Sequence, residues 1–148
     1  MEVFENEITI DKPVQEVWDF FSTRGNLHKW LQGFQSVRVT KGEFGQPGAR
    51  AEHTYRALGR SIVMNERVLV SEPCKRFESF VSNPAIDTGV KTMFEDLGEK
   101  TKVKCYVEVD IKSRPLKLIK KLIVKYSAER SKNDWKKLKS IVERKQKS

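Results

Sequence analysis

PLKLIKKLIVKYSAERSKNDWKKLKSIVERKQ, residues 115–146, is one continuous amphipathic pattern, and it decides the fold of this chain. Its stripe returns every three or four residues, which predicts an unbroken helix. A helix of about 32 residues spans about 48 Å, more than the ~30 Å width of a small domain, so we expect it to lie across a sheet. The stripe consists of Leu116, Ile119, Ile123, Tyr126, Arg130, Asp134, Leu138 and Ile141.

The preceding residues alternate with a period of two, apart from two short helical segments, one at Val14–Phe21 and one that ends near His28–Leu31. Strands are predicted at Phe4–Ile10, Gln35–Lys41, Ala49–Leu58, Ser61–Ser71, Arg76–Val81, Thr88–Asp96 and Thr101–Lys112. The pattern indicates a single α+β domain over residues 1–148. It would contain a seven-stranded antiparallel sheet, two short helices after the first strand, and the C-terminal helix over one face.

Two glycine-containing turns predict how neighbouring strands pair. A two-residue turn at Gly59-Arg60 would place Ala51 opposite Val68, His53 opposite Glu66 and Tyr55 opposite Met64. A turn at Gly98-Glu99 would place Val90 opposite Val107, Thr92 opposite Cys105 and Phe94 opposite Val103. Several of these inner side chains are too short to reach a layer packed about 10 Å away. We therefore expect a hollow between the sheet and the long helix.

Polar side chains interrupt this otherwise apolar interior. His53 and Glu66 form the one polar pair on the inner face, where they would fix the strand register, bind a polar ligand group or move a proton. Arg130 would either point into the hollow, toward a ligand carboxylate or Glu66, or extend its head to water at the rim. The candidate ligand-binding residues are Trp30, Ala51, His53, Tyr55, Met64, Glu66, Val68, Val90, Thr92, Phe94, Cys105, Val107, Tyr126 and Arg130.

The positive charge of the chain is concentrated at its C-terminal end. Residues 1–111 contain 15 basic and 17 acidic side chains, whereas residues 112–148 contain 14 basic and 3 acidic side chains. Such a helix face either stays in water or meets a transient partner such as an anionic membrane surface. Its aromatic residues, Tyr126 and Trp135, fall on or beside the apolar stripe, so it offers bases no stacking platform and we expect no nucleic-acid partner.

Several classes of chemistry have no signature in this chain. The two cysteines, Cys74 and Cys105, have no metal or redox spacing, and the sequence has no phosphate-binding glycine loop and no G-x-S-x-G motif. We therefore expect neither a metal nor another cofactor. The N-terminus is acidic, and no run of about 18 apolar residues occurs, so a cytoplasmic location is predicted.

The order of several segments is similar to that of a known superfamily. The segments are ITIDKPVQEVW (8–18), Trp30, GQPG (45–48), ERV (66–68) leading to Glu72-Pro73, and WKKLKSIVE (135–143). Together they resemble the START-like, or SRPBCC, superfamily, nearest to its polyketide cyclase/dehydrase and lipid-transport branch. The resemblance implies a helix-grip fold, in which a curved sheet holds the C-terminal helix around a deep hydrophobic cavity. It carries over no catalytic residue.

Three interpretations of function follow. We interpret the chain as a non-enzymatic protein that binds or carries a hydrophobic or amphipathic small molecule, such as a lipid, an isoprenoid or an aromatic polyketide. The enzymatic alternative is a cyclase or dehydratase that uses His53 and Glu66 as acid and base. The third is a co-chaperone or membrane-docking module that acts through the basic helix.

Overall fold

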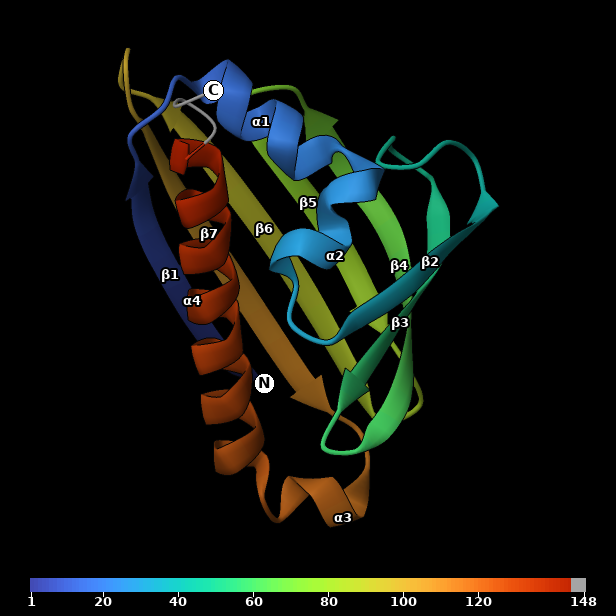
Figure 1. Cartoon of the computed structure of the whole chain (residues 1–148). Helices are drawn as coiled ribbons and strands as arrows, with labels where there is room; N and C mark the ends of the chain where they lie inside the picture. Colours follow the sequence, from blue (N-terminus) through green and yellow to red (C-terminus); the bar gives the residue numbers. More distant parts are fainter. Residues whose placement is uncertain (145–148) are drawn as a thin grey trace.

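A computed structural model describes residues 1–144 and confirms the helix-grip architecture (Figure 1). The strands are β1 (Glu2–Ile10), β2 (Phe34–Lys41), β3 (Arg50–Ala57), β4 (Arg60–Glu72), β5 (Arg76–Ser82), β6 (Ile86–Asp96) and β7 (Thr101–Ile111). The helices are α1 (Val14–Ser22), the 3-10 turn η1 (Arg24–Asn26), α2 (Leu27–Trp30), α3 (Arg114–Lys117) and α4 (Lys120–Arg144). The period-two alternation is clearest in β1 and β7, where more buried and more exposed residues follow one another in turn.

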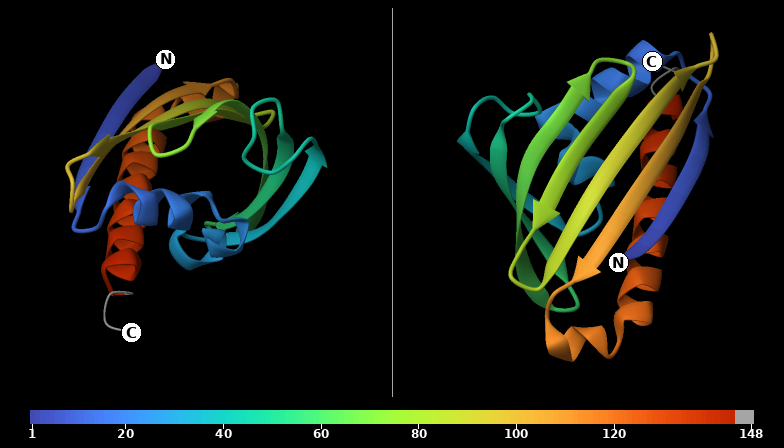
Figure 2. Two further views of the ribbon diagram at one scale, coloured as in Figure 1. Left: turned by 90° about the horizontal axis from the view of Figure 1, so that it is seen from above. Right: turned by 180° about the vertical axis from the view of Figure 1, so that it is seen from behind.

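All seven strands form one antiparallel sheet in the order β1-β7-β6-β5-β4-β3-β2. The sheet curves around α4, and α1 and α2 lie on the same concave side (Figure 2). Because β1 and β2 are the two edge strands, the segment between them must cross the whole sheet. The helices α1 and α2 make this crossing, and they close the upper end of the interior.

The long helix is not continuous, which corrects the prediction for residues 115–146. A turn at Leu118 and Ile119 separates α3 from α4, and α3 lies across the end of the sheet while α4 runs along it. Neither a proline nor a glycine occurs at this break, and the helical spacing of apolar residues continues across it. The sequence pattern therefore did not predict the break. Ile119, assigned to the buried stripe, is 46% exposed. Residue Gln146 of the predicted helix lies outside the described residues.

The β6–β7 register is confirmed, with Val90 opposite Val107 and Phe94 opposite Val103. The predicted β3–β4 register is wrong by two residues, because the turn consists of Leu58 and Gly59 rather than Gly59 and Arg60. Both turn residues have positive φ, 53° and 77°, as a type I′ turn requires. A shift of two keeps every side chain on its expected face, so the inner surface is the one predicted.

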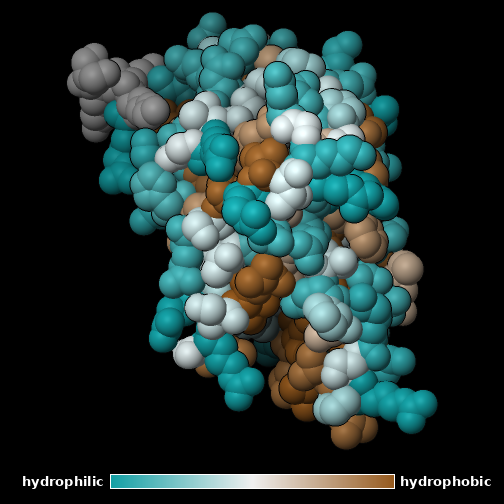
Figure 3. Space-filling model, turned by 90° about the vertical axis from the view of Figure 1, so that its right-hand side faces the viewer, coloured by the Kyte–Doolittle hydropathy of each residue, from teal (hydrophilic) through white to brown (hydrophobic). Residues whose placement is uncertain are grey.

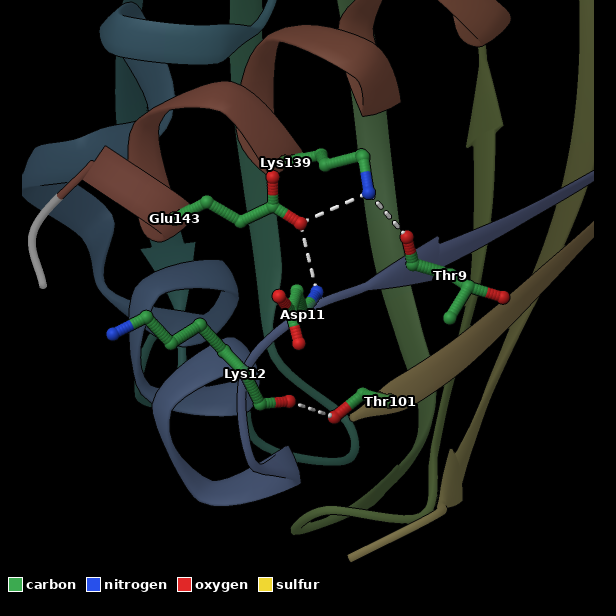
Figure 4. A network of polar contacts seen from close by, with 6 residues as sticks. All are labelled: Thr9, Asp11, Lys12, Thr101, Lys139 and Glu143. Atoms are coloured by element: carbon green, nitrogen blue, oxygen red, sulfur yellow. Dashed lines mark hydrogen bonds and ion pairs between the residues drawn. The ribbon is translucent and has the colours of Figure 1, made fainter. Parts of the chain in front are cut away.

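Hydrogen bonds fasten the C-terminal turns of α4 to the end of β1 (Figure 4). Lys139 Nζ donates to the carbonyl oxygen of Thr9 at 2.6 Å, and Glu143 Oε2 accepts from the backbone N–H of Asp11 at 2.8 Å and from Lys139 at 2.9 Å. Burial raises the pKa of Glu143, but these hydrogen bonds and the Lys139 charge outweigh it and hold the pKa below its usual value. The helix is therefore anchored at its upper end.

Candidate functional site

Aromatic side chains fill the upper half of the interior, next to α1 and α2. Trp135 of α4 lies 5.0 Å from Trp30 and 5.7 Å from Phe21, measured between ring centroids, and Trp18 lies 5.1 Å from Phe94. Trp30 and Phe94, both predicted to bind ligand, are thus packed into this core. The expected hollow does not extend into the upper half, and we leave both residues out of the proposed site.

A polar layer crosses the interior at mid-height, and Arg130 of α4 is its centre. Its guanidinium lies 4.6 Å from the centroid of the Tyr55 ring on β3, and its Nη2 donates to the carbonyl oxygen of Gln32 at 2.9 Å. Its Nε lies 3.9 Å from Asp134 Oδ2. Arg130 therefore turns toward Tyr55 and Gln32 and connects α4 to the opposite side of the sheet, where a cation–π contact is favourable.

Asp134 belongs to the same layer. Its Oδ1 accepts a hydrogen bond from the backbone N–H of Gln32 at 3.1 Å. Burial raises the pKa of Asp134 to about 6, although the Gln32 hydrogen bond and the Arg130 charge oppose the rise. The carboxyl group is thus less easily ionised in the folded protein than in the unfolded chain.

The raised pKa of Asp134 predicts a specific pH dependence of stability. Between pH ~4 and ~6, Asp134 keeps its proton in the folded protein but loses it in the unfolded chain. The free energy of unfolding should therefore fall as pH rises through this range, and the contribution of protonated Asp134 should be lost above about pH 6. Compared with wild type, Asp134→Asn should therefore gain relative stability between pH ~4 and ~7. Urea unfolding of both proteins across this range measures the difference. A difference that stays constant, or that moves the other way, would contradict the prediction.

His53 and Glu66 are in contact, as the position of both residues on the inner face suggests. His53 Nε2 lies 3.1 Å from Glu66 Oε1, although their backbones are offset along the β3–β4 ladder. When Glu66 is ionised, its carboxylate only accepts hydrogen bonds, and Nε2 then donates to it while Nδ1 is left as an acceptor. The other ring nitrogen, Nδ1, is buried and has no hydrogen-bond partner within residues 1–144. An unpaired buried acceptor is costly, so this nitrogen is suited to a donor group brought by a ligand.

Tyr55 connects the His53 pair to the polar layer. Its ring stacks on the His53 ring at 6.2 Å and 9°, and Phe34 packs edge-on against both rings. Burial raises the pKa of Tyr55 to about 12, with the Arg130 charge opposing the rise. The phenol is therefore a neutral hydrogen-bond donor at physiological pH. His53, Tyr55, Glu66 and Arg130 form one connected polar cluster.

Below this cluster the inner face remains partly open, and we name this part the open half. α4 packs mainly on β1, and its buried residues, Asp134, Trp135, Leu138 and Val142, all lie in its upper turns. The side chains here are apolar and only half-buried, and Figure 3 shows apolar surface recessed between polar side chains in the lower part of this side. The open half is lined by Ile62 and Met64 of β4, Val81 of β5, Val90 of β6 and Ile123 of α4.

Most of the remaining predicted residues are buried. These are Ala51, Val68, Thr92, Cys105 and Val107. Of these, Thr92 donates weakly to Cys105 Sγ at 3.9 Å. Tyr126 is 41% exposed and does not face the interior. Phe34, Ile62, Val81 and Ile123 were not among the predicted site residues, although the alternation of their strands and the helical stripe placed most of them on inner faces.

Two further features limit the chemistry. A shallow recess beside Glu66 is lined by side chains of the β2–β3 region including Val39, Phe44 and Ala49, and it has essentially no space that a water molecule could occupy. It is smaller than the roughly 300–1,000 Å³ of ordinary ligand sites. Within residues 1–144, no three His, Cys, Asp or Glu side chains are grouped as a metal site requires.

Comparison with known proteins agrees with this architecture. Among solved structures, an aromatase/cyclase named Zhui from Streptomyces sp. R1128 superimposes with a TM-score of 0.82 at 11% identity, over 97% of this chain and 94% of that chain. The protein TTHA0849 from Thermus thermophilus gives 0.76 at 19% identity, over 95% and 97%. Ara h 8.0201 gives 0.71 at 18% identity, over 95% and 97%. At these identities the likeness establishes the fold alone.

No protein with a curated description matches the sequence significantly. The sequence profile of one family, described as "Polyketide cyclase / dehydrase and lipid transport", matches residues 1–143. That match extends from β1 nearly to the end of α4 and includes the polar cluster and the open half. The chain belongs to the polyketide cyclase/dehydrase and lipid transport family.

Proposed function

We propose that this protein binds an amphipathic small molecule in the open half, with the polar end of the molecule toward His53 and Tyr55. The unpaired Nδ1 of buried His53 is the observation that carries the proposal. A ligand hydroxyl or N–H group would satisfy it, and the Tyr55 hydroxyl would donate to a ligand oxygen. The apolar body of the ligand would cover the half-buried side chains of the open half, at roughly 25 cal/mol per Å² of apolar surface removed from water.

The direct test is to purify the protein gently from its native cell, extract it with solvent, and identify the released molecules by mass spectrometry. A stoichiometric amphipathic compound is expected. If repeated preparations release nothing, and if 8-anilinonaphthalene-1-sulfonate, a dye that reports exposed apolar surface, does not bind either, the proposal is wrong.

Replacement of His53 by Gln should reduce ligand binding more than stability. The introduced amide still donates to Glu66, so the free energy of unfolding should fall by only about 1 kcal/mol. Glutamine has no acceptor atom at the position of Nδ1, so the co-purified ligand per protein should fall several-fold. His28→Gln, at the other histidine, is exposed and serves as the matched control. Unchanged ligand content together with a markedly lower melting temperature would show that His53 only supports the fold.

A second candidate function rests on the His53–Glu66 contact at 3.1 Å. In a cyclase, this pair would take a proton from an acidic C–H of a linear polyketone. A new carbon–carbon bond would form within the substrate, and the pair would return the proton to the attacked carbonyl oxygen. Turnover of a polyketone with a bell-shaped pH profile, abolished by Glu66→Gln, would support this function. Stoichiometric binding of the polyketone without turnover would contradict the cyclase function and support the binding function only.

The location of the protein and its partners belong to the same proposal. Among residues 1–144, no helix combines the length and the apolar character needed to cross a bilayer. We propose a cytoplasmic protein whose main partner is its small-molecule ligand and which has no nucleic-acid partner.

A further inference from the structure

The break between α3 and α4 exposes a group of apolar side chains that we name the apolar corner. Leu118 is 89% exposed, Leu122 is 66% exposed, and Ile119 and Tyr126 are more than two-fifths exposed. Ile119, Leu122 and Tyr126 follow one another at helical spacing, so they share one side of the first turns of α4. In contrast, Leu116 and Ile123 turn inward against the β7 side chains. The corner is therefore an outward apolar surface in addition to the packed one.

Basic residues flank this corner along the chain. Residues 112–125 contain six lysines or arginines and no acidic residue. Two of them are paired with acidic side chains of the sheet, Lys112 with Asp87 at 2.8 Å and Lys120 with Glu2 at 3.6 Å. For the other four, residues 1–144 provide no ion-pair partner, and these four are Arg114, Lys117, Lys121 and Lys125.

We propose that the apolar corner docks the protein onto an anionic lipid bilayer. A bilayer interface accepts aliphatic side chains at a depth of roughly 5–10 Å and places the lysines around them among the headgroups. Each basic side chain near an anionic leaflet strengthens binding about five-fold. Aliphatic Leu and Ile side chains offer no stacking surface to nucleic acid, whereas a bilayer satisfies both the apolar and the basic parts of the surface.

The position of the corner connects it with the ligand site. α3 and the β3–β4 turn lie at the same end of the molecule in both Figure 1 and Figure 2. The open half faces this end. Docking would therefore bring the open half close to the bilayer. Only this link between docking and the ligand rests on the proposed function; the docking proposal does not.

The test measures co-sedimentation with phosphatidylcholine vesicles, with and without phosphatidylserine. Wild type should bind only the vesicles that contain phosphatidylserine, and added salt should weaken the binding. The double variant Leu118→Asp/Leu122→Asp should bind at least about ten-fold more weakly, since two leucines leave the interface. The matched control is Leu69→Asp/Leu97→Asp, which changes two leucines of 48% and 46% exposure elsewhere on the protein and should bind like wild type.

A charge-reversal pair tests the electrostatic part without changing any apolar residue. Lys117→Glu/Lys121→Glu should weaken binding more than Lys136→Glu/Lys137→Glu, which changes the net charge equally on the upper turns of α4. Because all four lysines are exposed, both variants should retain the circular dichroism spectrum of wild type. Equal losses in the two variants would mean that only net charge matters, and would overturn the assignment of the corner.

Four other results would also overturn the proposal. The first is a wild-type protein that does not bind the anionic vesicles, and the second is a leucine variant that binds as wild type does. The third is a wild-type dimer that Leu122→Asp dissociates, since the corner would then contact a second copy. The fourth is that Val90→Trp, which blocks the open half, loses vesicle binding, because the vesicle lipids would then bind in the ligand site and not at the apolar corner. If Val90→Trp keeps vesicle binding but loses the ligand, docking and ligand binding are separate.

Discussion

Replacement of Trp135 by Ala should lower the free energy of unfolding by about 3–5 kcal/mol. Trp135 is 5% exposed and contacts Phe21, Trp30 and Phe94, with a nearly parallel stack on Phe21 at an interplanar angle of 14°. Truncation removes the ring that joins α4 to the other layer and leaves a cavity that its rigid aromatic neighbours cannot fill. Urea unfolding followed by circular dichroism measures the loss.

Tyr126→Ala, on an exposed turn of the same helix, provides the control and should change stability by no more than about 0.5 kcal/mol. If Trp135→Ala cost as little as this control, the aromatic cluster would not be the main attachment of α4. The anchoring of the helix would then lie in its hydrogen bonds to β1.

Replacement of Val90 by Trp should abolish most ligand binding while the fold is retained. Val90 lies on the inner face between Val107 of β7 and Ser79 of β5, at the centre of the open half. A bulky indole there would occupy the space that we assign to the ligand. The affinity for 8-anilinonaphthalene-1-sulfonate should fall about ten-fold or more, since the contacts of a drug-sized ligand depend on burial in its site.

Val63→Trp is the matched control for Val90→Trp. Val63 lies on the outer face of β4 opposite Thr54, so an indole at this position points away from the interior. This control should bind the dye as wild type does. If Val90→Trp also bound the dye unchanged, the open half would not be the ligand site.

Much of the fold was predictable because period-two alternation and turn glycines report local geometry directly. The strand predicted at Thr101–Lys112 is observed at Thr101–Ile111, and the β6–β7 register follows from its turn around Gly98. The β3–β4 register was not predictable in the same way. Leu58 adopts a positive φ of 53° in the turn, and a leucine in the sequence does not predict this conformation because non-glycine residues rarely adopt it.

The candidate site was only partly predictable. Alternation placed His53 and Glu66 on one face, and their contact withstood the register error because a shift of two preserves faces. Which inner positions stay open depends on packing between layers, and the pattern of one segment does not contain that information. Trp30 and Trp135 lie on helices far apart in the sequence, and their contact fills part of the expected hollow. The apolar corner arises from a helix break without any breaker residue.

The contacts from Arg130 to Tyr55 and Gln32 separate two parts of the interior. Above them, tightly packed aromatic rings stabilise the fold. Below them, the side chains of the open half are only half-buried. If the open half binds the ligand as we propose, substitutions there would alter which ligand is accepted with little loss of folding stability, because the packing of the aromatic rings does not depend on them. Such a partition would allow the same scaffold to change its cargo by small steps.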